Sequence, residues 1–375
     1  MTVALGDGAG VLGRCPDGTA VCAALATAAR AVGGIRLVLG WLPVPAEGLD
    51  VEAFAEVVFL MPGGVARRLL AAPNTRFVPA RLSAWAALLA GPLRPDVLIT
   101  RLAEHDGALH FGTEVSYQQD LVAAGVPVWA FVDHRAPVAS AEPPLHRDQV
   151  RVLGETGTGP AHHRREPEAV HEQLADAVLR FVPAGARLQY GPGPLGAALM
   201  RRTTVPLRID SGLLTDAVVD LDRRGLLLEN PSGTYLLGTD DLYDWARGRP
   251  VLRGVAHTHD LTRLSRGAPF IAVNTAVEID PAGQVNVEGQ HDKVIGGIGG
   301  HPDFCAAAAM HPRGLSIIAV PSASNGRSPL VERLSRPAST PASDIDVIVT
   351  ESGHADLRAA DWPLRHKLIA ELFGI

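Results

Sequence analysis

The sequence predicts an α/β protein made of two open domains, each with a mainly parallel sheet. Short apolar runs alternate with segments of helical periodicity along the chain, which is typical of parallel strands connected by helices. The 375 residues are too many for one comfortable core and suit two domains. A content of 47% hydrophobic and 20% charged residues is that of a globular protein.

The first half of the chain contains four apolar runs that indicate buried strands, and segments of helical spacing separate them. The helical segments read TAVCAALATAARAV, GGVARRLLAA and SYQQDLVAAG. This alternation favours parallel pairing. The predicted strands are residues 35–41, 55–61, 95–100 and 126–133.

Residues 137–168 are rich in proline, glycine and charge and predict an irregular connection. A helix over 169–182 follows and ends at the sequence PAGA. We therefore place a domain boundary there, with a first domain at 1–182 and a second at 183–375. The strand candidates of the second domain are residues 186–190, 205–210, 225–230, 234–238, 270–279, 315–322 and 344–351.

Charge and cysteine usage exclude several classes of protein. The net charge of −6 gives no reason to expect nucleic acid, because such a footprint is normally basic. The sequence contains no run of about 18 apolar residues, so it predicts no membrane span. The N-terminus lacks the features of a secretory signal. The three cysteines have neither disulfide nor metal spacing. We expect a reduced, cytoplasmic protein.

Three glycine-rich stretches invite a ligand interpretation. Residues 8–13, GAGVLG, fit a phosphate-binding pattern but lack the strand and the helix that the pattern requires. Residues 191–196, GPGPLG, follow a predicted strand and start a helix near Pro194; they form either a tight turn or an anion-binding helix start. Residues 296–300, GGIGG, precede a helix near Pro302, and free backbone amides there can stabilise an oxyanion.

One glutamate stands out in the predicted strand 270–279. On a strand, Ala272, Asn274, Ala276 and Glu278 share a face. A solvated face usually carries several large polar side chains, whereas this one leaves space around a single carboxylate. Glu278 is either a surface residue at a strand end or a group that needs room for a reaction partner.

The segments NTAVEIDPAGQVN, GGIGGHPDF and VTESGHADLR resemble, in order and spacing, the acetyl-CoA hydrolase/transferase family of CoA-transferases. That family includes acetate and 4-hydroxybutyrate CoA-transferases. LQYGPGPLGAAL and LLTDAVVDLDRRGLL are similar to further segments of its second domain. The resemblance extends more weakly to FVPARLS, PDVLITRLAEHDGALHFG and AGVPVWAFVD in the first half, so that it covers nearly the whole chain.

The resemblance implies two open α/β domains that face each other across a cleft. It also implies that Glu278 is the catalytic nucleophile and that amides around Gly299 and Gly300 receive the oxyanion. The substrates would be an acyl-CoA and a small carboxylic acid, with no metal. The resemblance further implies a homodimer or a larger homo-oligomer, as is usual in this family.

By the same resemblance, a further set of residues is expected to contact substrate or CoA. Several family positions are altered here: His301 replaces a glutamine, Arg313 lies near the place of a lysine, Ser328 begins a Ser-Pro in place of Ser-Arg, and Ser352 replaces an aromatic residue. The expected contact residues are Gln189, Gly191, Gly193, Asn274, Gly297, His301, Lys293, Arg313 and Glu351.

The substitution at His301 leaves two roles open. As an acid or base it would let water or another nucleophile discharge the glutamyl intermediate; as a neutral imidazole it would replace the hydrogen bonds of glutamine. Arg313, Arg327, Arg358 and Lys293 are candidate phosphate partners, and each is otherwise a surface charge.

Two other chemistries have weaker support. Residues 257–260, HTHD, contain two histidines with metal-like spacing, but no third ligand is evident nearby, and His162–His163 lies in the connector. Ser116 and Ser322 lack the G-x-S-x-G pattern of a serine hydrolase.

Three functions therefore remain. The first is an acyl-CoA:carboxylate CoA-transferase that forms a thioester on Glu278. The second is an acyl-CoA hydrolase or a specialised acyltransferase that uses the same glutamate. The third is a non-catalytic CoA- or nucleotide-binding protein with the same scaffold.

Overall fold

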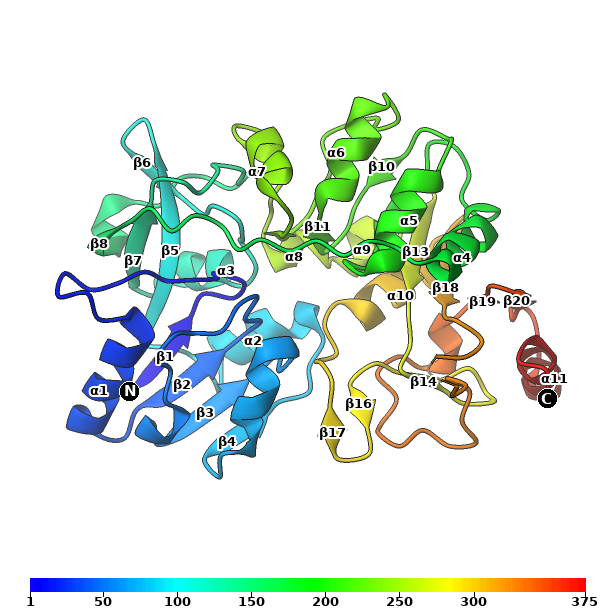
Figure 1. Ribbon diagram of the computed structural model, residues 1–375, viewed down its shortest axis with the longest axis horizontal. Helices are drawn as coiled ribbons and strands as arrows, with labels where there is room; N and C mark the ends of the chain where they lie inside the picture. The colour runs from blue at the N-terminus through cyan, green and yellow to red at the C-terminus, as the bar shows by residue number, and fades with distance from the viewer. Residues whose placement is uncertain (325) are drawn as a thin grey trace. The chain divides into compact units, whose positions relative to one another are not determined.

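The computed structural model describes residues 1–324 and 326–375 and shows an α/β protein with two large sheets and three two-stranded ones. Within each of the two large sheets nearly all neighbouring strands are parallel (Figure 1). The predicted fold class is therefore confirmed. The chain divides into two compact units, which are Met1–His163 with Gly233–His257, and Arg164–Ser232 with Thr258–Ile375.

These units differ in extent from the domains proposed at 1–182 and 183–375. The helix α4 (Ala169–Leu179) belongs to the second unit, where it contacts α5 (Pro194–Arg202). Residues 233–257 return to the first unit, which contains α7 (Asp240–Ala246).

The first unit is built on a sheet with the strand order β4-β3-β2-β1-β5-β7-β8, and β6 pairs antiparallel with β5. Helices α1 (Val21–Val32), α2 (Trp85–Ala90) and α3 (Gln118–Ala123) connect its strands. The strands are β1 (Thr2–Leu5), β2 (Arg36–Leu39), β3 (Glu56–Phe59), β4 (Thr75–Phe77), β5 (Val97–His105), β6 (Ala108–His110), β7 (Val128–Asp133) and β8 (Val150–Thr156).

The structure corrects the prediction in several parts of this unit. A strand, β1, does precede the glycine stretch at 8–13, although α1 starts only at Val21. Residues 64–71 form a 3₁₀ helix in place of the predicted α-helix, and this helix begins at Gly64 with φ +54°. The connector 137–168 is not wholly irregular, since β8 lies within it as an edge strand whose half-exposed residues gave a weak apolar signal.

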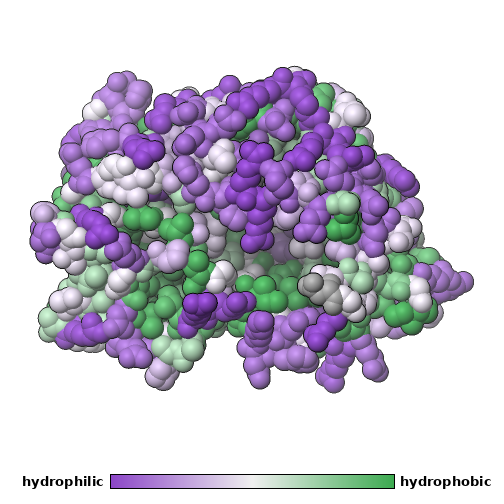
Figure 2. Space-filling model, viewed as in Figure 1, coloured by the Kyte–Doolittle hydropathy of each residue, from purple (hydrophilic) through white to green (hydrophobic). Residues whose placement is uncertain are grey.

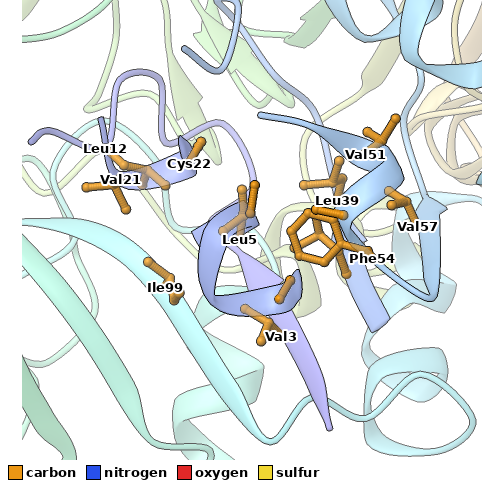
Figure 3. Packing of buried hydrophobic residues seen from close by; sticks show 14 of the residues in the cluster. Val3, Leu5, Leu12, Val21, Cys22, Leu39, Val51, Phe54, Val57 and Ile99 are labelled. Atoms are coloured by element: carbon orange, nitrogen blue, oxygen red, sulfur yellow. The ribbon is translucent and has the colours of Figure 1, made fainter. Parts of the chain in front are cut away.

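Strand residues of the first unit and α1 enclose a closely packed apolar core. Val3 and Leu5 of β1, Leu39 of β2 and Val57 of β3 are almost fully buried, and Val21 of α1 packs with them (Figure 3). Because strands of a parallel sheet are covered on both faces, they read in the sequence as continuous apolar runs.

The second unit is built on a sheet with the order β10-β9-β13-β18-β19-β20, of which only the β19–β20 pair is antiparallel. Its longer helices besides α4 and α5 are α6 (Asp216–Arg223), α10 (His301–Met310) and α11 (Trp362–Leu372). The strands are β9 (Arg187–Tyr190), β10 (Arg208–Ile209), β13 (Phe270–Asn274), β18 (Leu315–Ala319), β19 (Val347–Thr350) and β20 (Gly353–Asp356).

Two strand predictions are wrong in the second unit. The segment 225–230 is irregular and makes only a single bridge, from Leu227 to Leu207. The predicted strand 270–279 is interrupted, because β13 ends at Asn274 and β14 (Glu278–Ile279) pairs antiparallel with β15 (Val285–Asn286) instead. The alternation that placed Glu278 on the face of Asn274 therefore does not run through the whole segment.

The surface carries few large apolar side chains. Hydrophilic residues occupy much of the face in Figure 2, with smaller apolar areas between them. Within the described part of the chain, no helix has the length and apolarity needed to cross a membrane.

Candidate active site

Glu278 begins β14 and is only 4% exposed. Its carboxylate accepts three kinds of hydrogen bond, all from uncharged donors: Asn286 Nδ2 at 2.8 Å, the Ser335 amide at 2.9 Å and Ser335 Oγ at 2.8 Å. Across residues 1–324 and 326–375, no Lys or Arg forms an ion pair with it. The side chain therefore does not extend into bulk water.

Asn286 is the cross-strand partner of Glu278 in the β14–β15 pair. Directly opposed residues of an antiparallel pair place their side chains on the same face, which explains the contact. The register is fixed by the intervening turn, where Asp280 Oδ1 accepts hydrogen bonds from the amides of Ala282 and Gln284. The Asn286 amide group also donates to the Gly289 carbonyl at 2.7 Å.

Ser335 links the carboxylate to a neighbouring hairpin. Its Oγ donates to Glu278 and accepts from the His291 amide at 2.9 Å. His291 lies at the tip of the hairpin formed by β16 (Gly289–Gln290) and β17 (Lys293–Val294) (Figure 1). No sequence motif pointed to Ser335, which lies 57 residues beyond Glu278.

The glycine stretch 296–300 runs from the hairpin to α10. Gly299 has φ +64°, a conformation that favours glycine, and Gly300 is the N-cap of the helix. Pro302 lies in the first turn, as the sequence predicted. The first amides of a helix have no partners within it, so this end of α10 offers donors to an anion.

Gln189 and Asn274 pair with each other on neighbouring parallel strands. Asn274 Nδ2 donates to Gln189 Oε1 at 3.0 Å, and Gln189 Nε2 donates in return at 3.3 Å. Both are nearly buried. Gly191 and Gly193 follow β9, and the space beside both glycines is open, so a ligand can approach the backbone there.

His301 uses both ring nitrogens for hydrogen bonds. Nε2 lies 3.0 Å from the Thr275 carbonyl, and Nδ1 lies 2.7 Å from Thr340 Oγ1. A carbonyl oxygen only accepts, so Nε2 carries the proton and Nδ1 accepts from Thr340. Burial lowers the pKa of His301 to about 4, with the Thr275 carbonyl opposing that effect. This arrangement favours the neutral role over acid–base chemistry.

Three further candidates from the sequence are exposed or have other partners. Lys293 is exposed on β17, the Arg313 guanidinium donates to the Gly267 carbonyl, and Glu351 accepts from the Ser322 amide at 2.8 Å. No hydrogen bond or ion pair among the described residues connects any of these three to Glu278. Gly297 is part of the glycine stretch.

A cavity of about 680 Å³ lies beside the segment Thr275–Val277, which directly precedes Glu278. Thr275 follows β13 and Val320 follows β18, so the cavity is at the carboxyl ends of adjacent parallel strands. Open α/β sheets bind ligands at such ends. Arg327 supplies a positive charge. The other lining residues are Ala276, Val277, Gln290, Ile295, Pro321, Ser324, Ser328 and Pro329.

The first unit contains a separate buried cluster of polar side chains. Asp7, in the loop after β1, accepts hydrogen bonds from Ser116 Oγ and Tyr235 Oη, and burial raises its pKa to about 6. Burial raises the pKa of Glu114 to about 7, partly offset by the charge of Arg101. Ser116 is completely buried despite its strained φ of +43°, so it is not placed to attack a substrate.

The two histidine motifs have ordinary hydrogen-bond partners. His259 Nδ1 lies 2.8 Å from Thr258 Oγ1, and His162 Nε2 lies 3.0 Å from Asp240. Throughout the part of the chain that the structure describes, no three His, Cys, Asp or Glu side chains gather in a way that would hold a metal ion.

Comparison with known proteins finds similarity to CoA-transferases. Residues 238–372 match the family model of the acetyl-CoA hydrolase/transferase C-terminal domain. The chain is 26% identical over 284 residues to the 4-hydroxybutyrate coenzyme A transferase of Clostridium kluyveri, and 26% over 283 residues to the butyryl-CoA:acetate CoA-transferase of Anaerostipes caccae. These matches cover 70% and 69% of this chain but only 66% and 63% of the relatives' own lengths.

Solved structures share the fold. RipA from Yersinia pestis superimposes with a TM-score of 0.87 at 23% identity and covers 99% of this chain and 90% of its own. A 4-hydroxybutyrate CoA-transferase from Porphyromonas gingivalis gives 0.77 at 19% identity, covering 99% and 89%. The family model and the two CoA-transferases similar in sequence confirm the resemblance predicted from the sequence motifs.

Proposed function

We propose, from the match of residues 238–372 to the acetyl-CoA hydrolase/transferase C-terminal domain, that the chain is a CoA-transferase. It would move CoA between an acyl-CoA thioester and a carboxylic acid through a covalent thioester on Glu278. The similarity to 4-hydroxybutyrate and butyryl-CoA:acetate CoA-transferases supports this class of reaction.

The observation that carries the proposal is the environment of the Glu278 carboxylate. It is 4% exposed and lies next to Val277, which lines the 680 Å³ cavity. Its partners are the neutral groups of Asn286 and Ser335. Such donors orient a carboxylate without the neutralising charge that a Lys or Arg would bring, so its oxygen lone pairs stay available for attack.

The chemistry balances without an external acid or base. A Glu278 oxygen attacks the thioester carbonyl, the carbon–sulfur bond breaks, and CoA leaves as a thiolate, which yields an acyl-glutamyl anhydride. The thiolate then attacks the glutamyl carbonyl and releases the free carboxylate, which leaves the enzyme–CoA thioester. A second carboxylate reverses both steps. Covalent catalysis of this kind divides one difficult exchange into easier ones.

Each attack places negative charge on a carbonyl oxygen. We assign its stabilisation to the amides at Gly299 and Gly300, at the start of α10. One preorganised donor of this type typically contributes roughly 3–4 kcal/mol to lowering the barrier. His301, with both ring nitrogens engaged, would support the neighbouring segment rather than move a proton.

We propose that residues around the cavity and around the glycine stretches 191–196 and 296–300 recognise the substrates. The cavity's Arg327 is suited to an anionic group of CoA or of the acid. The residues assigned to substrate and CoA are Gln189, Gly191, Gly193, Asn274, Gly297, His301, Lys293, Arg313 and Glu351.

We also propose that the protein forms a homodimer or larger homo-oligomer, which sedimentation or light scattering would test.

Intact mass spectrometry tests the proposal directly. After incubation with an acyl-CoA, the wild-type protein should gain the mass of CoA, and Glu278→Ala should not. Glu288→Gln is the matched control, because Glu288 is another 4% exposed carboxylate nearby but accepts its hydrogen bond from Ser339. An adduct that persists in Glu278→Ala would overturn the assignment.

The same incubation separates the alternatives. Steady release of CoA in the absence of any carboxylic acid would identify an acyl-CoA hydrolase. Acyl-CoA binding with neither an adduct nor turnover would identify a binding protein. A transferase requires the acid acceptor and should show parallel-line kinetics when the two substrates are varied.

A further inference from the structure

His259 lies directly against the glycine turn that precedes α10. The imidazole is 2% exposed and packs on the ring of Phe304, with ring centroids 4.6 Å apart and planes inclined by 43°. Phe304 lies near the start of α10, and none of the chemical steps proposed above involves it. The ring of His259 therefore touches the helix at the end where its free amides lie.

Gly300 and His259 share a space that only one side chain can occupy. A Cβ atom on Gly300 would lie within 3.0 Å of His259 Nε2, of His259 Cδ2 and of Phe304. Real Cβ atoms essentially never approach other atoms so closely. The backbone of Gly300 reaches its position because it has no side chain and because the edge of the imidazole forms the surface against which it turns.

The chain around His259 holds the ring in place. Nδ1 is hydrogen-bonded to Thr258 Oγ1 at 2.8 Å. Asp260 caps the next helix, α9 (Leu261–Leu264), through the Thr262 amide at 2.8 Å. Arg263 of that helix forms two hydrogen bonds with the nearly buried Asp210, at 2.7 and 2.8 Å. The Thr258 hydrogen bond and the anchored helix α9 both fix the imidazole, so the ring can set the position of backbone that packs against it.

The imidazole is also uncharged under ordinary conditions. Burial and, to a smaller extent, the nearby charge of Arg263 lower the pKa of His259 to about 3. A neutral ring does not repel or attract an oxyanion by net charge, so its effect on the turn is one of shape and contact.

We infer that His259 is a positioning residue for the oxyanion site: its imidazole sets the path of the Gly299–Gly300 turn and so directs the amides at the start of α10. This rests on the proposed CoA-transferase function. It gives the HTHD motif a role other than metal binding.

A double-mutant cycle between Gly300 and His259 tests the inference. Gly300→Ala should unfold at a lower temperature and lose activity, because the new methyl group meets the imidazole. His259→Ala should lower kcat roughly ten- to a hundred-fold, with KM for acyl-CoA changed less than about two-fold, because misplaced donors weaken binding of the transition state more than of the substrate. Gly300→Ala/His259→Ala should recover part of the lost melting temperature and kcat of Gly300→Ala.

His259→Asn keeps a hydrogen-bonding group for Thr258 and removes the Nε2 edge, so it covers the case in which His259→Ala does not fold. It should show the same loss of kcat with a melting temperature near that of the wild type. A wild-type kcat in His259→Asn, or a double variant no better than Gly300→Ala in melting temperature and kcat, would overturn the inference.

The outcomes also separate this inference from the proposed function. Turnover without any Glu278 adduct would contradict the covalent mechanism, yet the coupling of the two substitutions in thermal unfolding would remain. An adduct on Glu278 together with no coupling in unfolding would contradict only the role of His259.

Discussion

Ser335 donates to Glu278 twice: its single hydroxyl proton is shared between the two carboxylate oxygens, at 2.8 Å and 2.9 Å, and its amide donates at 2.9 Å. No other residue in the described chain makes as many hydrogen bonds to this side chain. The rotamer of the proposed nucleophile thus depends on a serine from a distant loop.

Replacing that hydroxyl should impair catalysis more than folding. Ser335→Ala removes one donor from an anion, and hydrogen bonds to charged groups typically contribute about 1.5–3 kcal/mol. We expect kcat to fall roughly ten- to a hundred-fold in a transferase assay. Ser343→Ala, which alters an exposed serine of the same unit, is the control. An unchanged kcat in Ser335→Ala would show that Asn286 and the Ser335 amide suffice to hold Glu278.

The two ring bonds of His301 predict which substitution the site accepts. His301→Gln can donate to the Thr275 carbonyl and accept from Thr340, so it should retain most of the activity and the pH profile of kcat. His301→Ala loses both bonds and should lower kcat by about ten-fold or more. If His301 acted as an acid or base, His301→Gln would be as inactive as His301→Ala and would lose one limb of the profile.

His301 also predicts how stability changes in acid. Its folded-state pKa of about 4 is below the ordinary 6.5, so the unfolded state binds more protons between these values. Stability is therefore full above about pH 6.5 and falls as the pH drops toward 4, by at most about 3 kcal/mol from this residue. Urea unfolding at pH 7 and pH 4.5 should show a smaller loss in His301→Gln. The exposed His105, replaced by Gln, is the control.

The buried carboxylates of the first unit should give the opposite dependence. The pKa of Asp7 is raised from 3.8 to about 6 by burial, so the folded state holds a proton that the unfolded state has lost. Stability then decreases as the pH rises from about 4 to 6, by about 3 kcal/mol, and is constant above. Asp7→Asn should flatten this part of the unfolding profile, whereas Asp17→Asn, at an exposed acid, should not. Identical profiles for wild type and Asp7→Asn would contradict the assignment.

Charge in the cavity should affect binding rather than the chemical step. Arg327 lines the cavity beside Val277, so Arg327→Ala should raise KM for an anionic substrate about ten-fold with little change in kcat. Arg266→Ala, which removes an exposed guanidinium outside the cavity, is the control. A lower kcat with unchanged KM would instead place Arg327 at the reacting atoms.

The interior strands could be predicted from the sequence because parallel strands are covered on both faces. Residues 126–133 and 315–322 read as continuous apolar runs and form β7 and β18. The edge strand β8 could not be predicted in this way, since its residues are half-exposed and mixed in character. Residues 225–230 contain three consecutive leucines, yet they form no strand beyond one bridge, because strand pairing depends on neighbours that are distant in sequence.

The candidate site, too, could be predicted from the sequence only in part. Glu278 and the glycine stretch were proposed from local motifs, since their residue types and spacing carry the resemblance. Ser335 and His259 were not proposed as catalytic or positioning residues, because their contacts with Glu278 and Gly300 exist only in the folded chain. The interrupted strand before Glu278 escaped prediction for a similar reason: the Thr275 carbonyl bonds to His301, 26 residues later, in place of continuing the sheet.

The hydroxyl of Ser335 also accepts a hydrogen bond from the amide of His291, so the tip of the β16–β17 hairpin is fastened to the group that holds Glu278. Loading CoA onto that carboxylate would abolish its charge and release Ser335 from its strongest acceptor. Deuterium uptake at the hairpin tip would then show, in each half-reaction, whether CoA is bound covalently to Glu278.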